Sequence, residues 1–437
     1  MSREMKDSGI SWIGEIPSDW RIGHLKRLAR IKTGSTPSRS VEEYYSEKSG
    51  LPWIKPENLN SYDSVENTAE YLTAEGRVAG TVFPQNTVFA CCIASIGKIG
   101  YSNIEASCNQ QINGLIYNDL INWKYGFYSN VAANNEYLAR ANSSVQFILN
   151  STNQGYIQMP IPSIAEQEII STFLDSKCEA IDQAIQKLKD IVNKLIEYKQ
   201  STITQAVTKG LNPNSEMKDS GVEWIGETPE KWEIMRIKDT SWLKGRIGWD
   251  GLKASEFIDE GPYLITGTDF CNGYVNWDTC VHITKQRFEE DTLLHIREND
   301  LLITKDGTVG KVAIAKNCPK ETSLNSGVMI IRNESRYIYN SKYMYYILLS
   351  DEFKHWFEYS QKPGSTIKHL YQHQFGEFKY TFPPLEEQQQ IADFLDSKCS
   401  KINESIERSN KIIQKLEEYK KALIYNAVTG KIDCRNA

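Results

Sequence analysis

The feature that most constrains the fold of this 437-residue sequence is an internal tandem duplication. The segment MKDSGISWIGEIPSDW, starting at Met5, returns as MKDSGVEWIGETPEKW at Met217 with 11 of 16 positions identical. The segment PSIAEQEIISTFLDSKC at Pro162 returns as PPLEEQQQIADFLDSKC at Pro383 with 10 of 17 identical. Because the matches keep their order over more than 200 residues, chance is a poor explanation. A period this long excludes solenoids and propellers and predicts two copies of one unit.

Each half has a diverged interior of about 140 residues between its repeated blocks. Apolar runs such as residues 87–90 and 301–304 are bounded by turn residues, which is typical of short buried strands. Helical patterns occur near residues 125–138 and 342–357. Each interior is therefore predicted to be a mixed α/β (α+β) globule.

Each half closes with a predicted helix of about 45 residues, or roughly 65–70 Å. Ser163, with Glu166 three positions on, resembles a capping box at the start of the first helix. Apolar positions then recur in alternating steps of four and three, which is a heptad pattern. The two seams comprise Leu174, Cys178, Ile181, Ile185, Leu188, Val192, Leu195, Lys199, Thr202 and Ala206, and Leu395, Cys399, Ile402, Ile406, Ser409, Ile413, Leu416, Lys420, Leu423 and Ala427.

A long helix with one apolar stripe needs a partner, and the nearest is the other copy in the same chain. An antiparallel coiled coil would give the molecule an internal pseudo-two-fold symmetry. The alternative is that each helix packs separately on its own domain. The predicted divisions are a first globular domain (1–161), a central long helix (162–209), a linker (210–220), a second globular domain (221–382), and a distal helix with tail (383–437).

The net charge of −6, from 50 Lys and Arg against 56 Asp and Glu, excludes a globally basic coat but not a basic face. Nine scattered cysteines without CxxC spacing favour reduced thiols over zinc ligands. The N-terminus lacks an apolar signal core, and no apolar run reaches about 18 residues. A cytoplasmic protein is therefore expected.

Motifs of common catalytic sites are missing from the sequence. Gly307 to Lys311 is too short for a phosphate-binding loop and is interpreted as a tight turn. The pair His369 and His373 lacks the glutamate of the zinc-protease pattern, and no Asn/Asp-Pro-Pro-aromatic segment of amino-methyltransferases occurs. Neither a catalytic residue, a metal site nor a bound cofactor is predicted for this chain.

Local charge differs from the total. Residues 15–40 carry a local charge of +4 and lead into a hydroxyl-rich loop at residues 33–38, which suits phosphate contacts. Comparable basic segments occur in the second half. Any one patch could be a solvated surface, but their recurrence in both halves favours DNA. Asn and Gln suit adenine edges, and Arg and Lys suit guanine or phosphate. The candidate DNA-binding residues are Lys32, Ser35, Thr36, Ser38, Lys98, Asn109, Gln110 and Gln111 in the first domain, and Arg246, Lys305, Thr308, Lys311, Asn325, Lys362, Ser365 and Thr366 in the second.

These motifs, in this order, resemble the specificity subunits of type I restriction–modification systems. The resemblance rests on KDSGxxWIGExPxxW at Lys6 and Lys218, PxxxEQ at Pro162 and Pro383, FLDSK at Phe173 and Phe394, EYK at Glu197 and Glu418, and VTGK at Val428. One departure is Lys209-Gly210, which stands where the second copy has Gly430-Lys431.

The resemblance implies two target-recognition domains separated by two long antiparallel helices. Each domain would read one part of a bipartite double-stranded DNA target, and helix length would set the gap. It also implies modification subunits that bind S-adenosylmethionine and methylate adenine, and restriction subunits that translocate and cleave DNA. Two other hypotheses remain: a duplicated coiled-coil scaffold that binds only proteins, and an enzyme with an unrecognised site.

Overall fold

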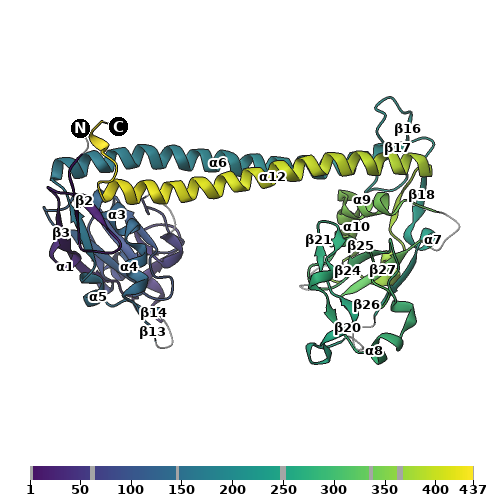
Figure 1. The fold of residues 1–437 in the computed structure, drawn as a ribbon, viewed down its shortest axis with the longest axis horizontal. Helices are drawn as coiled ribbons and strands as arrows, with labels where there is room; N and C mark the ends of the chain where they lie inside the picture. The colour runs from purple at the N-terminus through teal and green to yellow at the C-terminus, as the bar shows by residue number, and fades with distance from the viewer. Residues whose placement is uncertain are drawn as a thin grey trace. The chain divides into compact units, whose positions relative to one another are not determined.

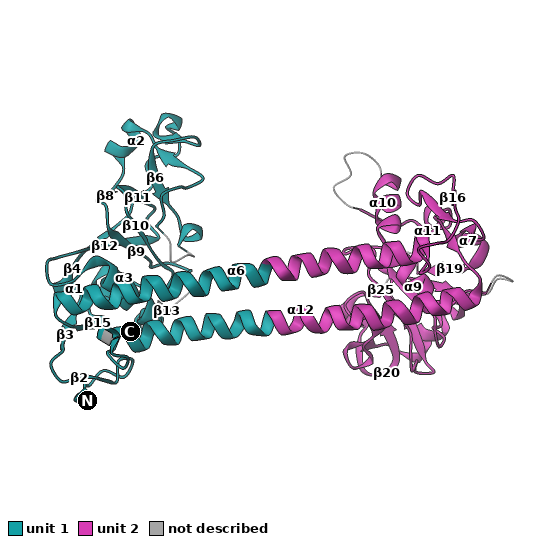
Figure 2. Cartoon of the chain, turned by 90° about the horizontal axis from the view of Figure 1, so that it is seen from above, with its two compact units in different colours: residues 1–189, 410–437 teal, residues 190–409 magenta. Residues whose placement is uncertain are grey.

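The computed structural model describes residues 3–59, 64–143, 147–246, 252–333, 338–361 and 368–436. The chain forms two compact units: unit 1 is Met1–Lys189 with Asn410–Ala437, and unit 2 is Asp190–Ser409. Their boundary crosses both long helices, α6 (Ile164–Lys209) and α12 (Leu385–Val428), as the colours of Figure 2 show. Each unit thus combines one strand-rich domain with a part of each helix. The five-part division made from sequence stays a prediction.

Unit 1 contains two main sheets. A four-stranded antiparallel sheet has the order β10-β9-β12-β4, and a five-stranded sheet has the order β5-β7-β6-β11-β8, in which β6 and β11 are parallel. The strands are β4 (Ala29–Thr33), β5 (Tyr45–Ser46), β6 (Leu51–Ile54), β7 (Tyr71–Leu72), β8 (Val82–Phe83), β9 (Thr87–Cys91), β10 (Ile99–Ser102), β11 (Ala106–Cys108) and β12 (Ile112–Tyr117).

The four-stranded sheet of unit 1 is buried on both faces, which explains the continuous apolar run in β9. Val88 and Ala90 on one face share a core with α3 (Trp123–Ala132) and the long helices. Phe89 and Cys91 on the other face share a core with residues of β6, β8 and β11. Successive strand residues therefore alternate between the two cores.

Unit 2 repeats this plan. Its first sheet has the order β19-β27-β24-β25-β22-β21, and its second has the order β23-β20-β26 with β20 and β26 parallel. The strands are β19 (Trp242–Gly245), β20 (Ile258–Ile265), β21 (Phe270–Cys271), β22 (Tyr274–Val275), β23 (Val281–His282), β24 (Leu301–Thr304), β25 (Val312–Ile314), β26 (Thr322–Leu324) and β27 (Val328–Arg332). Leu301 and Ile303 face a core containing α9 (Ser341–Leu349) and α10 (Asp351–Ser360), while Leu302 faces the second sheet.

Shorter elements complete both units (Figure 1). The two-stranded pairs are β1 (Met5–Asp7) with β2 (Glu15–Pro17), β3 (Arg21–His24) with β15 (Gln158–Ile161), β13 (Asn142–Ser143) with β14 (Phe147–Ile148), β16 (Met217–Asp219) with β17 (Glu227–Pro229), and β18 (Glu233–Arg236) with β28 (Lys379–Phe382). The short helices are α1 (Leu25–Leu28), α2 (Ala74–Ala79), α4 (Asn134–Ala139), α5 (Ser151–Gly155), α7 (Ile237–Thr240), α8 (Lys285–Glu289) and α11 (Gln372–Phe375).

The two long helices run antiparallel within each unit, as predicted. In unit 1, Lys420 of α12 pairs with Asp182 of α6, and residues at the end of α12 share a hydrophobic core with residues near the start of α6. In unit 2, Lys199 Nζ donates to Asn403 Oδ1 at 2.8 Å. All of the predicted seam positions are buried or half-buried, so the heptad interpretation is confirmed.

The predicted capping box of α6 forms only in part. The Ser163 hydroxyl accepts the backbone N–H of Glu166 at 3.3 Å, as expected for an N-cap. The Glu166 side chain, however, accepts the Trp20 indole N–H at 2.9 Å and pairs with Arg3. In unit 2, the Trp232 indole N–H donates to Glu387 in the same way, also at 2.9 Å. In both units, a tryptophan of the repeated N-terminal block is thus hydrogen-bonded to the first turn of a long helix, α6 or α12.

Candidate nucleic-acid interface

The candidate residues of unit 1 gather at one edge of the four-stranded sheet. Strand register pairs Thr33 with Asn113, and Cys91 with Ile112, so the end of β4, the start of β12 and the loop between β9 and β10 share this edge. The residues from this edge and its adjoining loops are Lys32, Ser35, Thr36, Ser38, Lys98, Asn109, Gln110 and Gln111. Lys32 and Gln111, which are 79 residues apart in the sequence, thereby come from the same edge.

The hydroxyl-rich loop packs directly against the Asn-Gln loop. The Ser35 backbone N–H donates to the carbonyl of Cys108 at 2.9 Å, and the Thr36 hydroxyl bonds the Gln110 side chain. Gly34 makes this approach possible, because a Cβ there would lie 2.3 Å from the Cys108 carbonyl oxygen and 2.4 Å from that of Asn109. Thr36 and Gln110 remain exposed, which leaves their polar groups within reach of a ligand.

Some candidates of unit 1 hold the loops rather than extend from them. Asn109 is only 9% exposed, and its Oδ1 accepts the backbone N–H of Gln111 at 3.1 Å. The Ser35 hydroxyl accepts the backbone N–H of Thr81 at 2.7 Å. Lys32 and Ser38 are exposed, while Lys98 is half-buried. The side chains most available to a ligand are therefore those of Lys32, Thr36, Ser38 and Gln110.

The described candidates of unit 2 lie at the corresponding edge. Gly245 pairs with Met329, and Thr304 pairs with Val328, which brings the ends of β19 and β24 to the start of β27. Arg246, Lys305, Thr308, Lys311 and Asn325 come from this edge and its loops. Lys362, Ser365 and Thr366 lie outside the described residues, so their place stays a prediction.

Hydrogen bonds of the two edges repeat almost bond for bond. The turn before β12 is closed by a bond from Ile112 N to Asn109 O, and the turn before β27 by one from Val328 N to Asn325 O, both 3.2 Å. The hairpin glycines Gly97 and Gly310 have φ of 89° and 88°, a left-handed conformation that favours glycine. The structure thus places Gly307 to Lys311 in a tight hairpin turn, as the sequence indicated.

Burial changes the interpretation of Arg246. Its side chain is 2% exposed, its Nε donates to the Leu324 carbonyl at 3.1 Å, and its Nη2 reaches the Ser323 hydroxyl at 3.4 Å. Lys305 Nζ donates to the Arg246 carbonyl at 3.0 Å. As placed, Arg246 supports the sheet edge from within, whereas Thr308 and Lys311 are exposed on the hairpin beside it.

A charged cluster that the sequence does not reveal lies beside the edge of unit 1. Arg39 and Lys55 both pair with Glu70, and their positive charges hold the pKa of that carboxyl near 2, with the Arg39 hydrogen bond as the main cause. Arg39 belongs to the basic segment at residues 15–40, and its charge alone does not distinguish it from the other cations there. Glu70 lies 31 residues away from it, and no local pattern pairs them. Aromatic residues at Tyr45 and Trp53, interleaved with cations, were the available signal.

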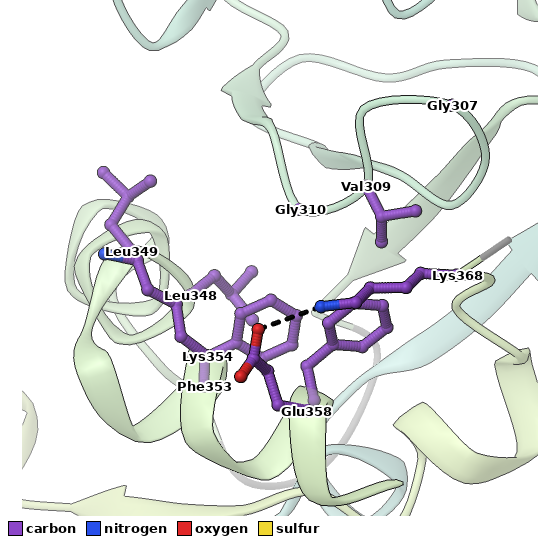
Figure 3. A pocket seen from close by; sticks show the side chains of 10 residues that line it. Gly307, Val309, Gly310, Leu348, Leu349, Phe353, Lys354, Glu358 and Lys368 are labelled. Carbon is purple, nitrogen blue, oxygen red and sulfur yellow. Dashed lines mark hydrogen bonds and ion pairs between the residues drawn. The ribbon is translucent and has the colours of Figure 1, made fainter. Parts of the chain in front are cut away.

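A recess of about 370 Å³ opens beside the Gly307–Gly310 turn of unit 2 (Figure 3). Its floor is apolar, with Leu348 and Phe353, and an ion pair of Lys368 with Glu358 at 2.9 Å lies at its rim. The described part of the chain holds no group of three or more His, Cys, Asp or Glu side chains that could bind a metal. Within the same residues, no helix is long and apolar enough to span a membrane.

Two copies of one α+β domain, each with polar loops at the same sheet edge, define a duplicated protein with two equivalent candidate recognition surfaces. Residues 17–194 and 229–418 both match the type I restriction modification DNA specificity domain. These matches cover most of the sequence, so the chain belongs to that family of type I restriction–modification specificity proteins.

Individual relatives agree over nearly the whole length. The chain is 25% identical over 431 residues to the type I restriction enzyme MjaIX specificity subunit of Methanocaldococcus jannaschii, covering 96% of this chain and 95% of that one. It is 22% identical to the EcoBI specificity subunit of Escherichia coli, with 95% and 88% covered.

Solved structures share the fold. A chain from a structure concerning complex assembly and conformational transition of the type I R-M system superposes with a TM-score of 0.72 at 13% identity, covering 95% of this chain and 99% of that one. The HsdS subunit from Thermoanaerobacter tengcongensis gives a TM-score of 0.50 at 14% identity, with 95% and 98% covered. The predicted fold class, two similar α+β domains joined through long antiparallel helices, is confirmed.

Proposed function

We propose that this chain is the non-catalytic DNA-specificity subunit of a type I restriction–modification complex. Each domain reads one half of a bipartite duplex target through its polar sheet edge, and the long helices set the gap and dock the modification subunits. The observation that carries this proposal is the repeated edge: backbone bonds at Asn109 and Asn325 build the same turn in both units, while the surrounding side chains differ.

In this proposal, the partner subunits carry out the chemical reactions. The modification subunits bind S-adenosylmethionine and methylate adenine, which must leave the base stack to be methylated. The restriction subunits translocate and cleave DNA. This chain binds no cofactor and positions the complex on host DNA in the cytoplasm.

Methylation by the reconstituted complex tests the proposal. The chain is purified with the modification subunits of its own system, and methylated adenines are mapped on genomic DNA. A single motif with two specific parts and a fixed gap is expected. If the complex methylates no bipartite sequence, the proposal fails, and binding to proteins alone without methylation would favour the scaffold hypothesis.

Two matched variants sharpen the test. Lys98 and Lys311 occupy equivalent places after the hairpin glycines of the two units. If each lysine contacts a phosphate, K98A and K311A weaken binding about equally for all sequences. Each also makes the negative slope of log affinity against log salt shallower by about one. An unchanged salt slope in both variants would exclude a phosphate contact by either lysine.

A further inference from the structure

Arg39 of unit 1 is held in a fixed orientation although it lies at the surface. Its guanidinium stacks on Tyr45, 4.1 Å from the ring centroid, and on Trp53, 4.7 Å from the centroid. Its Nη1 and Nη2 donate to the two carboxylate oxygens of Glu70 at 2.7 and 3.1 Å. The side chain nevertheless remains 49% exposed. An exposed arginine normally samples many rotamers, so this geometry means that much of the ordering cost is met before any ligand arrives.

The rings beneath Arg39 are tied to the candidate interface. The Trp53 indole N–H donates to the Ser35 carbonyl at 3.2 Å, and the Tyr45 hydroxyl donates to the Pro37 carbonyl at 2.6 Å. Both acceptors belong to the loop that also holds Thr36 against Gln110. Arg39 therefore shares a rigid support with the exposed polar groups of the sheet edge.

The donors left on Arg39 suit a guanine. A guanidinium has five N–H groups, and Glu70 uses one on each terminal nitrogen. The Nε–H and a neighbouring Nη–H form a second parallel pair. Guanine presents two acceptors, O6 and N7, side by side in the major groove, and bidentate arginine is the commonest specific contact to them. The charges of Lys55 and Glu70 offset each other, so the cluster of these two side chains with Arg39 keeps one net positive charge.

We propose that Arg39 is a specificity-determining residue of the first recognition domain and reads a guanine in the major groove of one half-site. This inference rests on the proposed function and deepens it. A role limited to bracing the loop would use the same contacts with Glu70, so only a change in base preference separates the two roles.

The second domain differs at the position that corresponds to Lys55, which provides an internal reference. Backbone N–H groups of Lys55 and Thr266 bond Asn58 and Asp269 in the same local turn, at 2.9 and 2.7 Å, so Thr266 occupies the position of Lys55. Hydroxyls of Thr266 and Thr268 therefore stand where unit 1 carries a cation. A change at Arg39 is expected to alter one half-site and leave the other intact.

The test measures methylation by the complex of this chain with its modification subunits. Duplexes carry the mapped site with every position of both halves randomised in turn. The variants are R39A, R39K, which keeps the charge but not the bidentate fork, and K55A, a matched loss of the other cation on Glu70. Thermal unfolding of each variant checks the fold, and R39K preserves the test if R39A unfolds.

The wild-type complex is expected to require guanine at one position of one half. R39A and R39K should reduce that preference by about 5- to 150-fold, the discrimination typical of one bidentate pair. The other half stays unchanged, and K55A keeps the guanine preference. If R39A methylates all sequences less but ranks the bases as before, Arg39 is only a brace and the inference is overturned. A wild-type complex that methylates no bipartite site overturns the proposed function itself, and the reading role with it.

Discussion

Tyr125 and Tyr343 provide a matched test of how each recognition domain is fixed to its helix pair. The Tyr125 hydroxyl lies 3.1 Å from the carbonyls of both Pro160 and Val428. It therefore joins the end of β15 to the end of α12. The Tyr343 hydroxyl lies 3.1 Å from the Thr381 carbonyl and 3.2 Å from that of Val207, which makes the same junction in unit 2.

The two junctions differ by one hydroxyl. In unit 2, Thr381 Oγ1 donates to the Val207 carbonyl at 2.5 Å, so this acceptor keeps a donor when the tyrosine is shortened to phenylalanine. In unit 1 the equivalent residue is Pro160, which has no hydroxyl. A net hydrogen bond contributes about 1 kcal/mol, and a buried acceptor left without a donor costs a further 1–3 kcal/mol or so. Y125F should therefore cost about 2–4 kcal/mol, and Y343F about 1 kcal/mol.

Hydrogen exchange and calorimetry measure both variants separately. At about 2–4 °C per kcal/mol for a unit of this size, Y125F should lower the unfolding temperature of unit 1 by about 4–16 °C. Exchange of peptides from unit 2 should be unchanged in Y125F. Equal losses in the two variants, or a larger loss in Y343F, would refute the reasoning that the Thr381 hydroxyl compensates for the missing donor.

Three further outcomes are expected. Burial raises the pKa of Glu352 to about 8, so the folded state binds the proton more tightly than the unfolded state does. Unit 2 should therefore lose roughly 1.4 kcal/mol of stability per pH unit as pH rises from about 4.5 to 8. E352Q should flatten this profile in denaturation series and stabilise unit 2 at pH 8, and a profile as steep as that of the wild type would contradict the assignment. G34A should unfold unit 1 or displace its loop, because backbone oxygens of Cys108 and Asn109 occupy the space of the new Cβ, whereas G327A, with nothing within 4 Å, should melt like wild type. Removing one heptad from each of α6 and α12 shortens each helix by about 10 Å and should change the gap in the methylated motif by about three base pairs; a changed half-site sequence would contradict the division of labour between domains and helices.

Regular elements were predictable because their signals are local or repeated. The apolar seam of α6 is visible in the local sequence as apolar residues spaced alternately four and three positions apart. The duplication then indicates that α12 is the equivalent helix. The apolar runs at residues 87–90 and 301–304 are buried strands, because both faces of each strand meet a core. These patterns depend on burial of a whole face, which a sequence displays directly.

The contacts within the candidate site were less predictable, because they depend on distant partners. A charge count ranks Arg246 and Arg39 alike, yet Arg246 is buried against Ser323 and Leu324, while Arg39 is half exposed. The partner of Arg39, Glu70, directly precedes β7, and it is brought close by the pairing of β7 with β5 and β6. Burial of a polar side chain is a property of the assembled fold, and charge pattern along the chain does not report it.

The repeated edge explains how one fold can present different readers in the same chain. Its turns are closed by backbone groups: Cys92 N bonds the carbonyl of Gln111 at 2.7 Å, and Lys305 N bonds that of Gly327 at 2.8 Å. Cysteine and lysine thus occupy one position, and glutamine and glycine the other, without changing the frame. Because a backbone hydrogen bond is indifferent to the side chain that accompanies it, exposed residues at this edge can be exchanged at little cost in stability. Positions such as Gly34, where backbone atoms leave no space for a Cβ, cannot. Diverged interiors within a repeated frame are therefore what a pair of readers with different targets requires.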